Sequence, residues 1–79
     1  MFYTYVLQSL QDRKLYVGFC DDLKVRVQKH NKGLVLATVN RRPLKLIYYE
    51  ACLKRQDAIK REKALKTGYG RAYLKRRLF

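Results

Sequence analysis

Apolar and polar residues along the chain form runs that predict three strands and three helices. Residues 2–8 are aromatic and β-branched, and residues 15–20 have the same character after a short polar segment, which is typical of a β-hairpin. A third strand is predicted at residues 44–52. Helical composition is found at residues 23–30, 54–66 and 71–78. The order β-β-α-β-α-α predicts an α+β domain with a small antiparallel sheet and helices packed against it.

Capping residues mark the ends of the predicted helices. Asp21 and Asp22 precede the first helix, where an acidic side chain caps free N–H groups and complements the helix dipole. Gly33 follows that helix and suits the position just beyond its end. Gly68 is expected to break the second helix, and the last helix is expected to begin only after Gly70.

The composition adds a strong positive charge to this small domain. The 79 residues include 19 Lys and Arg against 6 Asp and Glu, a formal net charge of +13, and 48% of them are hydrophobic. One folded basic domain is expected, with nucleic acid as its first candidate partner and an anionic membrane surface as the second. No apolar run approaches the roughly 20 residues of a membrane span and no secretory signal is found, so a cytoplasmic protein is expected. One His and two Cys are too few for a structural zinc site.

Two tyrosines of the predicted hairpin are candidates for chemistry. If paired residue numbers in the hairpin sum to 21 or 23, Tyr5 and Tyr16 lie on the same face of the sheet. Gly18 weakens a strand, so its presence indicates a bulge or the close approach of another group. Simple cross-strand packing of two aromatic rings is the alternative interpretation.

The first predicted helix carries an arginine and a histidine toward the sheet. Leu23 and Val27 define the apolar stripe of this helix. His30 falls within the stripe, and Arg26, four residues earlier, falls at its edge. An inward Arg is suited to bind a phosphate, and a His to donate a hydrogen bond or move a proton. A snorkelling Arg and a buried structural His are the alternative.

A single carboxylate is distinctive in the second predicted helix. Ala58, Ile59 and Leu65 form its apolar stripe, and Glu62 falls near the centre of that stripe. Since Glu is rarely buried without a partner, an inward Glu62 needs a cation, either Arg26 in a structural ion pair or a divalent metal. The other structural alternative is that the apolar stripe simply ends at Leu65. Together with two tyrosines, an Arg and a His on a basic domain, such a carboxylate would suit hydrolysis of a phosphodiester bond.

The two tyrosines also belong to a wider pattern. Tyr3-Thr4-Tyr5, followed after ten residues by Tyr16-Val17-Gly18, resembles the two-part motif of the GIY-YIG endonucleases. The similarity extends over nearly the whole chain and is greatest to the stand-alone, single-domain branch of that family, so residues 1–79 are expected to form one nuclease domain. Further matching positions are Arg26, His30, Arg41-Arg42-Pro43-Leu44, Tyr48-Tyr49-Glu50 and Lys60-Arg61-Glu62-Lys63.

The resemblance implies a three-stranded antiparallel sheet flanked by helices, and hydrolysis of DNA with Mg²⁺ or Mn²⁺. By motif position it implies that Tyr5 and Tyr16 are the active-site tyrosines. Family members differ over which tyrosine is nearer to the role of general base; we favour Tyr16, with Tyr5 helping to orient water. It also implies that Arg26 contacts phosphate, that Glu62 holds the metal, and that His30 occupies a frequent polar position.

The sequence departs from the family in ways that bear on its substrate. The larger nucleases carry an Asn near the end of the domain, and residues 67–79 contain none, so either Thr67 or Arg71 replaces it or the site is less complete. Without a second domain, sequence specificity would be weak, or target choice would depend on a protein partner or on the shape of branched or nicked DNA. Basic residues expected to contact phosphates outside the site are Arg41, Arg42, Lys45, Arg71, Lys75, Arg76 and Arg77. A module that binds DNA or RNA without cutting it is the alternative function.

Overall fold

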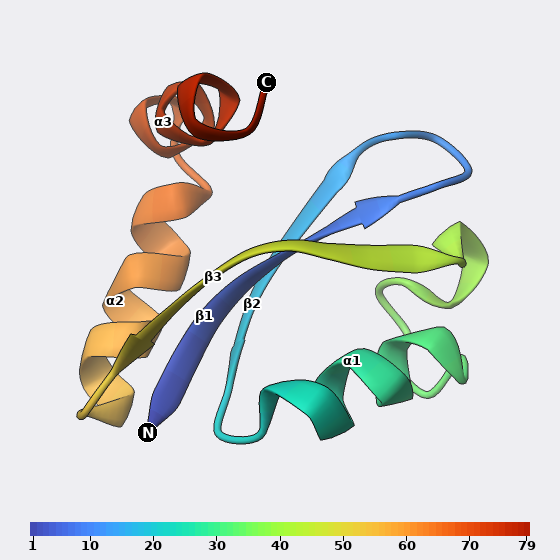
Figure 1. The fold of residues 1–79 in the computed structure, drawn as a ribbon, viewed down its shortest axis with the longest axis horizontal. Coiled ribbons are helices and arrows are strands. Elements are labelled where there is room, and N and C mark those ends of the chain that lie inside the picture. Colours follow the sequence, from blue (N-terminus) through green and yellow to red (C-terminus); the bar gives the residue numbers. More distant parts are fainter.

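A three-stranded antiparallel sheet with helices on both of its faces forms the fold (Figure 1). The computed structural model describes all residues, 1–79. The strands are β1 (Phe2–Ser9), β2 (Leu15–Cys20) and β3 (Leu44–Cys52), in the spatial order β2-β1-β3. The helices are α1 (Leu23–Asn31), α2 (Arg55–Leu65) and α3 (Gly68–Leu78), with a short 3₁₀ helix, η1 (Val39–Arg41). The predicted α+β class, the three strands and the order β-β-α-β-α-α are confirmed.

β1 is the central strand, and its side chains alternate between two small cores. Tyr5 and Leu7 point toward α1, and Val27 of that helix packs against their cluster. Val6 points to the other face and packs with Leu65 of α2. Both faces of the sheet are therefore covered, with α1 on one side and α2 on the other (Figure 1). None of the helices has the length and apolar content that a membrane-spanning segment requires.

The register of the hairpin brings the two predicted tyrosines to one face. Tyr5 lies opposite Gly18. Leu7 lies opposite Tyr16, so paired residue numbers sum to 23, one of the two expected values. A Cβ atom at position 18 would lie 2.6 Å from the hydroxyl oxygen of Tyr5. The close approach predicted at Gly18 is therefore that of the Tyr5 ring.

Local hydrogen bonds define both ends of α1. Asp22, the second of the two candidate residues, is the N-cap, and its Oδ1 accepts a backbone N–H of the first turn at 3.2 Å. Gly33 adopts a φ of +78° just beyond the helix, and its N–H donates to the carbonyl of His30 at 3.1 Å. The N–H of Leu34 donates to the carbonyl of Lys29 at 3.0 Å, which completes a Schellman motif. The chain therefore turns away shortly after His30.

A polar cluster joins β3 to α2 and α3. Glu50 of β3 accepts hydrogen bonds from Arg61 of α2 at 2.9 and 3.0 Å and from the hydroxyl of Tyr48 at 2.5 Å. The Arg61 guanidinium lies 5.0 Å from the ring centre of Tyr73 on α3. Burial opposes ionisation of Glu50, but the hydrogen bonds from Arg61 and Tyr48 hold the pKa of this carboxyl below its usual value. Glu50 is thus a structural carboxylate with protein partners.

α3 begins at Gly68, three residues earlier than the predicted start at residue 71. Thr67 is its N-cap and accepts the N–H of Gly70 at 3.2 Å. Gly70 is buried, and a Cβ atom there would overlap the carbonyl oxygen of Ala64 and the backbone of Leu65. The expectation that the helix starts after Gly70 is wrong because this glycine lets α3 touch the end of α2 directly. Its helix-weakening tendency is overridden by that packing.

The contact at Gly70 leads to a test with a matched control. We expect Gly70→Ala to lower the free energy of unfolding by about 1–3 kcal/mol, because the added methyl group meets backbone atoms that cannot move aside easily. Gly68→Ala should leave stability unchanged or raise it by up to about 1 kcal/mol, since nothing lies within 4 Å of a Cβ atom there. Urea denaturation of both variants measures the difference, and equal stabilities would contradict the proposed contact.

Candidate active site

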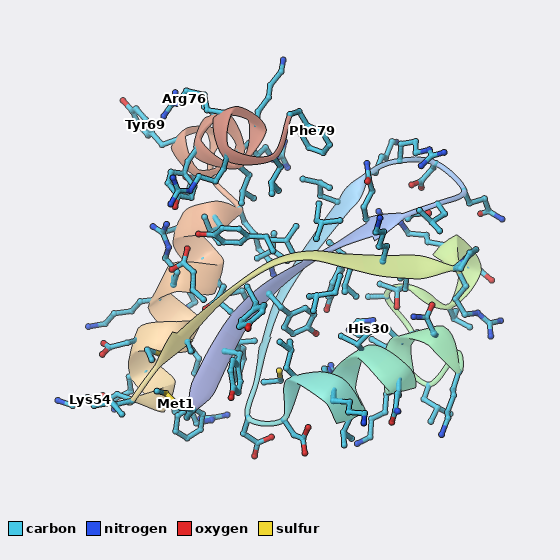
Figure 2. All side chains as sticks on the ribbon, viewed as in Figure 1. Met1, His30, Lys54, Tyr69, Arg76 and Phe79 are labelled. Carbon is cyan, nitrogen blue, oxygen red and sulfur yellow. The ribbon has the colours of Figure 1, made fainter.

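Three predicted site residues meet in a hydrogen-bonded group on the α1 face of the sheet. The hydroxyl of Tyr5 lies 2.8 Å from Nε2 of His30, and Nε of Arg26 donates to the same hydroxyl at 3.3 Å. Tyr5 and His30 are both 0% exposed, and Figure 2 shows His30 on the side of α1 that faces the sheet. Tyr16 adds a fourth side chain, with its ring centre 5.1 Å from that of His30 and 6.4 Å from that of Tyr5.

His30 has a second partner, Thr38, that the sequence analysis did not single out. Nδ1 of His30 lies 2.7 Å from the buried hydroxyl of Thr38, which has the carbonyl of Val35 within 3.5 Å. If Nδ1–H donates to Thr38, the hydroxyl of Tyr5 donates to Nε2 and every donor has an acceptor. The other tautomer leaves the buried Tyr5 O–H without an acceptor, so the first is favoured. A buried His needs a hydrogen-bond partner for each ring nitrogen. A hydroxyl side chain in residues 34–43, the segment after the helix that carries His30, could therefore have been predicted as the second partner.

Burial keeps this group uncharged apart from Arg26. Desolvation raises the pKa of Tyr5 to about 12, although the Arg26 guanidinium acts in the opposite direction. Desolvation, followed by the positive charge of Arg26, lowers the pKa of His30 to about 4. At neutral pH both side chains are neutral, and proton transfer from Tyr5 to His30 would be strongly unfavourable. As neutral groups, Tyr5 and His30 therefore hold Arg26 in place through hydrogen bonds and do not relay a proton.

Arg26 and Tyr16 are the members of the group that reach the surface. Arg26 is half-buried and lines a cavity of about 320 Å³ at the start of α1, and Tyr5 engages only its Nε. Tyr16 is also half-buried, and no protein group forms a hydrogen bond with its hydroxyl. At the edge of β2 it also borders a separate cavity of about 260 Å³ on the α2 face, lined by Lys66 and Arg71 and here called the tyrosine cavity. A substrate can therefore touch Arg26 and Tyr16 directly.

Glu62 lies on α2, across the sheet from α1 (Figure 1). Its side chain is 16% exposed, and its Oε2 lies 2.9 Å from Nζ of Lys66. The alternative ion pair with Arg26 is not formed, because the two residues belong to helices on opposite faces. Lys66 also lines the tyrosine cavity, so this residue links Glu62 to the surroundings of Tyr16. Since β2 is an edge strand, groups from both faces can approach Tyr16 around that edge.

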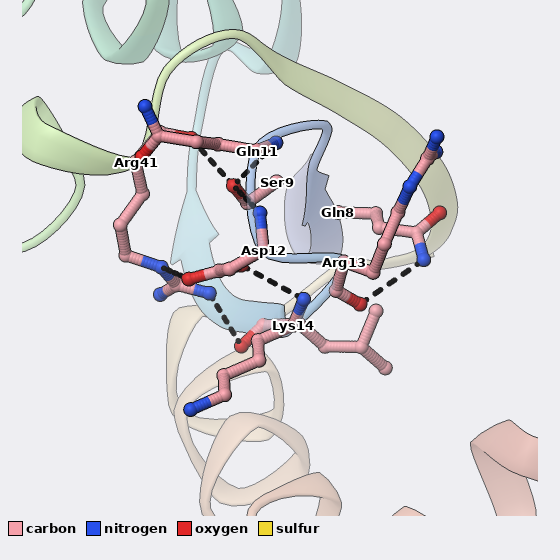
Figure 3. A network of polar contacts seen from close by, with 8 residues as sticks. Gln8, Ser9, Gln11, Asp12, Arg13, Lys14 and Arg41 are labelled. Carbon is pink, nitrogen blue, oxygen red and sulfur yellow. Dashed lines mark hydrogen bonds and ion pairs between the residues drawn. The ribbon is translucent and has the colours of Figure 1, made fainter.

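The basic residues predicted outside the site divide among several surfaces. Arg71 and Lys75 line a cavity of about 620 Å³ between α3 and the β1–β2 turn, here called the hairpin cavity. Arg41 is tied to that turn by an ion pair at 3.4 Å (Figure 3). The other predicted residues, Arg42, Lys45, Arg76 and Arg77, are exposed elsewhere. Arg13 and Lys14 also line the hairpin cavity, and the sequence analysis missed them because only the packed fold brings the turn near α3.

Similar proteins are found both by sequence and by structure. A family model described as the GIY-YIG catalytic domain matches residues 1–76. UPF0213 proteins of Staphylococcus aureus strains Mu3 and N315 are each 38% identical over 66 residues, which cover 82% of this chain and 79% of each relative. The solution NMR structure of the UPF0213 protein BH0048 from Bacillus halodurans is similar with a TM-score of 0.55 and 27% identity, over 94% of this chain and 82% of that one.

The buried His30 makes stability depend on pH. Its pKa is about 4 in the folded protein and 6.5 as an ordinary His, so its contribution is fully present above pH 6.5. Between pH 6.5 and pH 4 the unfolded chain binds a proton that the folded protein does not, so the free energy of unfolding should fall. The fall is at most about 3 kcal/mol.

His30→Gln is the comparison for this pH dependence, because Gln does not titrate and keeps two polar ends. Urea unfolding of both proteins over the same pH range separates the His30 contribution from that of the carboxylates, which both proteins share. We expect a flatter curve for His30→Gln than for the unaltered chain. Parallel curves would mean that His30 titrates normally in the folded protein.

Proposed function

Because the chain belongs to the GIY-YIG family, a family of nuclease domains, we propose that it is an endonuclease that hydrolyses DNA phosphodiester bonds with a divalent cation. The observation that carries this proposal is the hydrogen-bonded group of Tyr5, His30 and Arg26 on a domain with a net charge of +13. These residues come from β1 and α1, and the hydrogen bonds between them leave one cation, Arg26, at the surface. Such a fixed cation suits a phosphate.

Arg26 is assigned the contact with the scissile phosphate. Its Nε donates to Tyr5, which fixes the plane of the guanidinium and leaves its two terminal nitrogens free for other partners. A planar fork of N–H donors matches two oxygens of a phosphate. Tyr5 is fully buried, and His30 and Arg26 occupy its hydroxyl. We therefore assign Tyr5 the positioning of Arg26, in place of the orientation of water that we expected from the sequence.

Tyr16 is assigned the proton transfer from the attacking water. Its hydroxyl is free of protein partners, and it is half-buried, so water can reach it. The edge contact with the ring of His30, 5.1 Å between centres, limits its movement. Lys66 and Arg71 line the tyrosine cavity on the other face of the sheet, and from there they would add positive charge at the edge of β2. This assignment makes Tyr16 the general base and Tyr5 its structural neighbour.

A divalent cation such as Mg²⁺ or Mn²⁺ would be held by Glu62. The family resemblance assigns this role to Glu62, and no other His, Cys, Asp or Glu side chains cluster with it into a group of three. This donor set fits Mg²⁺, which binds one or two carboxylates and completes its coordination with water and substrate phosphate. Lys66 engages one oxygen of Glu62, and the other oxygen has no hydrogen-bond partner. When bound, the cation would neutralise charge on the phosphate.

Target choice is proposed to come from the shape of the DNA or from a protein partner. The family model of the catalytic domain matches residues 1–76. Any DNA recognition by these residues must therefore use the surface of the catalytic fold itself. The exposed basic residues on that surface can contact phosphates, and phosphate contacts position DNA without reading its sequence. Branched and nicked DNA are therefore the first substrates to test.

Cleavage with Mg²⁺ or Mn²⁺ tests the proposal directly. We expect Glu62→Gln to lower the cleavage rate by about 100-fold or more, since it removes the only ligand assigned to the cation. Asp57→Asn is the matched control: this exposed carboxylate lies on the same helix and should be dispensable. Activity that persists in EDTA, or equal rates for the two variants, would refute the assigned site. Salt-sensitive binding of DNA or RNA without any cleavage would support the alternative, a non-catalytic binding module.

The two tyrosines should respond differently to loss of the hydroxyl. We expect Tyr16→Phe to lower the cleavage rate by about 100-fold or more, because it removes the proposed base. Tyr5→Phe should lower the rate by only about 10-fold, because Arg26 loses a support but keeps its charge. Single-turnover rates at saturating protein compare the two variants, and a larger loss for Tyr5→Phe would reverse the assignment.

A further inference from the structure

The hairpin cavity is a concentrated positive surface that the proposed catalytic residues do not use. Its lining residues are Arg13, Lys14, Leu15, Arg71, Lys75 and Phe79. Four of these six side chains are cations and none is acidic. Figure 2 shows Phe79 on the side of α3 that faces the hairpin, and its side chain is 72% exposed. Like charges at this density repel one another, so a polyanion is the ligand that this cavity suits.

The β1–β2 turn that supplies two of the cations is held in one shape (Figure 3). The buried hydroxyl of Ser9 donates to the carbonyl of Arg41 at 2.7 Å and accepts the backbone N–H groups of Gln11 and Asp12 at 3.2 and 3.3 Å. Oδ1 of Asp12 accepts the backbone N–H of Lys14 at 2.9 Å. The cations of the turn therefore extend from a fixed backbone toward α3.

Arg13 occupies a backbone conformation that favours other residues. Its φ is +65°, in the left-handed region that glycine and asparagine adopt most readily. The Arg13 side chain makes no ion pair and is exposed, so no contact within the chain explains the choice of arginine. An arginine in a backbone conformation that it rarely adopts suggests a functional role, such as contact with a ligand.

The hairpin cavity adjoins the tyrosine cavity. Leu15 and Arg71 line both of them, and Tyr16 borders the second at the edge of β2. A nucleic-acid strand with its scissile bond beside Tyr16 could therefore continue past Arg71 to the β1–β2 turn. Across the two cavities the cations are Arg13, Lys14, Lys66, Arg71 and Lys75, with no carboxylate in the lining.

We propose that the hairpin cavity binds a single-stranded segment of nucleic acid next to the cleavage site. Its cations would contact successive phosphates, and the exposed ring of Phe79 would stack on a base, with Leu15 as a second apolar contact. In a duplex the faces of the bases are stacked and inaccessible, whereas a single strand exposes both its phosphates and its base faces. The cations of the hairpin cavity suit the phosphates, and its apolar side chains suit the base faces. The position next to the cleavage site rests on the proposed nuclease function, and it predicts substrates with a single-stranded arm, such as flaps or splayed junctions.

Binding in EDTA tests this subsite without cleavage. Fluorescence anisotropy would compare a labelled short oligothymidylate with a blunt duplex of equal length at one salt concentration. We expect Phe79→Ala to weaken binding of the single strand by about 5- to 10-fold and of the duplex by less than about twofold. Unchanged affinity of Phe79→Ala for the single strand would overturn the proposal.

The charge contribution is tested by two double variants that each remove two positive charges. Arg13→Gly with Lys14→Ser should weaken single-strand binding by about 10-fold and reduce the slope of log K against log salt by about 1.4. Lys54→Ser with Lys60→Ser is the matched control, because both residues are exposed and neither lines the two cavities; Lys54 precedes α2 and Lys60 lies in its middle (Figure 2 labels Lys54). Equal losses in the two double variants would show a general charge effect and overturn the subsite.

Stability and cleavage controls separate this proposal from its alternatives. Glycine adopts a positive φ freely, so Arg13→Gly should keep or raise the midpoint of thermal unfolding, and lost binding then cannot be caused by unfolding. The unaltered chain could fail to cleave every substrate while Phe79→Ala still weakens its binding to single strands. That result would refute the nuclease function and support the single-strand subsite.

Discussion

The site depends on one packing contact, the Tyr5 ring lying across Gly18. No side chain at position 18 separates the ring from β2, so the Tyr5 hydroxyl ends beside α1, within reach of both His30 and Arg26. A methyl group there would meet that oxygen at 2.6 Å and push the ring away. The position of Arg26 relative to the sheet therefore follows from an absent side chain on the neighbouring strand. This connects the two halves of the sequence motif physically: one supplies the tyrosine and the other the space for it.

The packing of Tyr5 against Gly18 also gives the loop after α1 a role in the site, because that loop supplies a partner for His30. A neutral His30 buried beside Tyr5 must satisfy its second nitrogen, and Thr38 does so from residues that have no regular strand or helix. The Schellman motif at Gly33 turns the chain so that this loop returns toward the helix it has just left. Arg26 is thus supported through a chain of neutral groups. Since desolvation holds the pKa values of Tyr5 and His30 far from neutral pH, this support keeps its protonation state in the physiological range.

Most of the fold was predictable from the sequence because short-range patterns determine it. Alternating residues in the hairpin placed Tyr5 and Tyr16 on one face, and helical spacing turned Arg26 and His30 toward the sheet. The start of α3 was not predictable, since Gly70 weakens a helix locally and is required only by contact with α2.

The parts of the site that escaped prediction depend on the folded arrangement. Thr38 and Arg13 reach their places through a loop and a turn, whose positions follow from packing and not from periodicity. The catalytic roles of Tyr16 and Glu62 remain predictions, because no group in the fold joins them directly and their meeting would require substrate.

The excess positive charge attracts polyanions but does not distinguish one nucleic acid from another. Four of the six carboxylates have structural partners: Asp12, Asp22, Glu50 and Glu62. Few are left to neutralise 19 Lys and Arg, so the surface near β2 accelerates the approach of any nucleic acid. Selection must then come from geometry. A strand that brings a phosphate to Arg26 and Tyr16 on the α1 face must pass the edge of β2 to reach Lys66 and Arg71, and an unpaired strand bends around such an edge more easily than a duplex does.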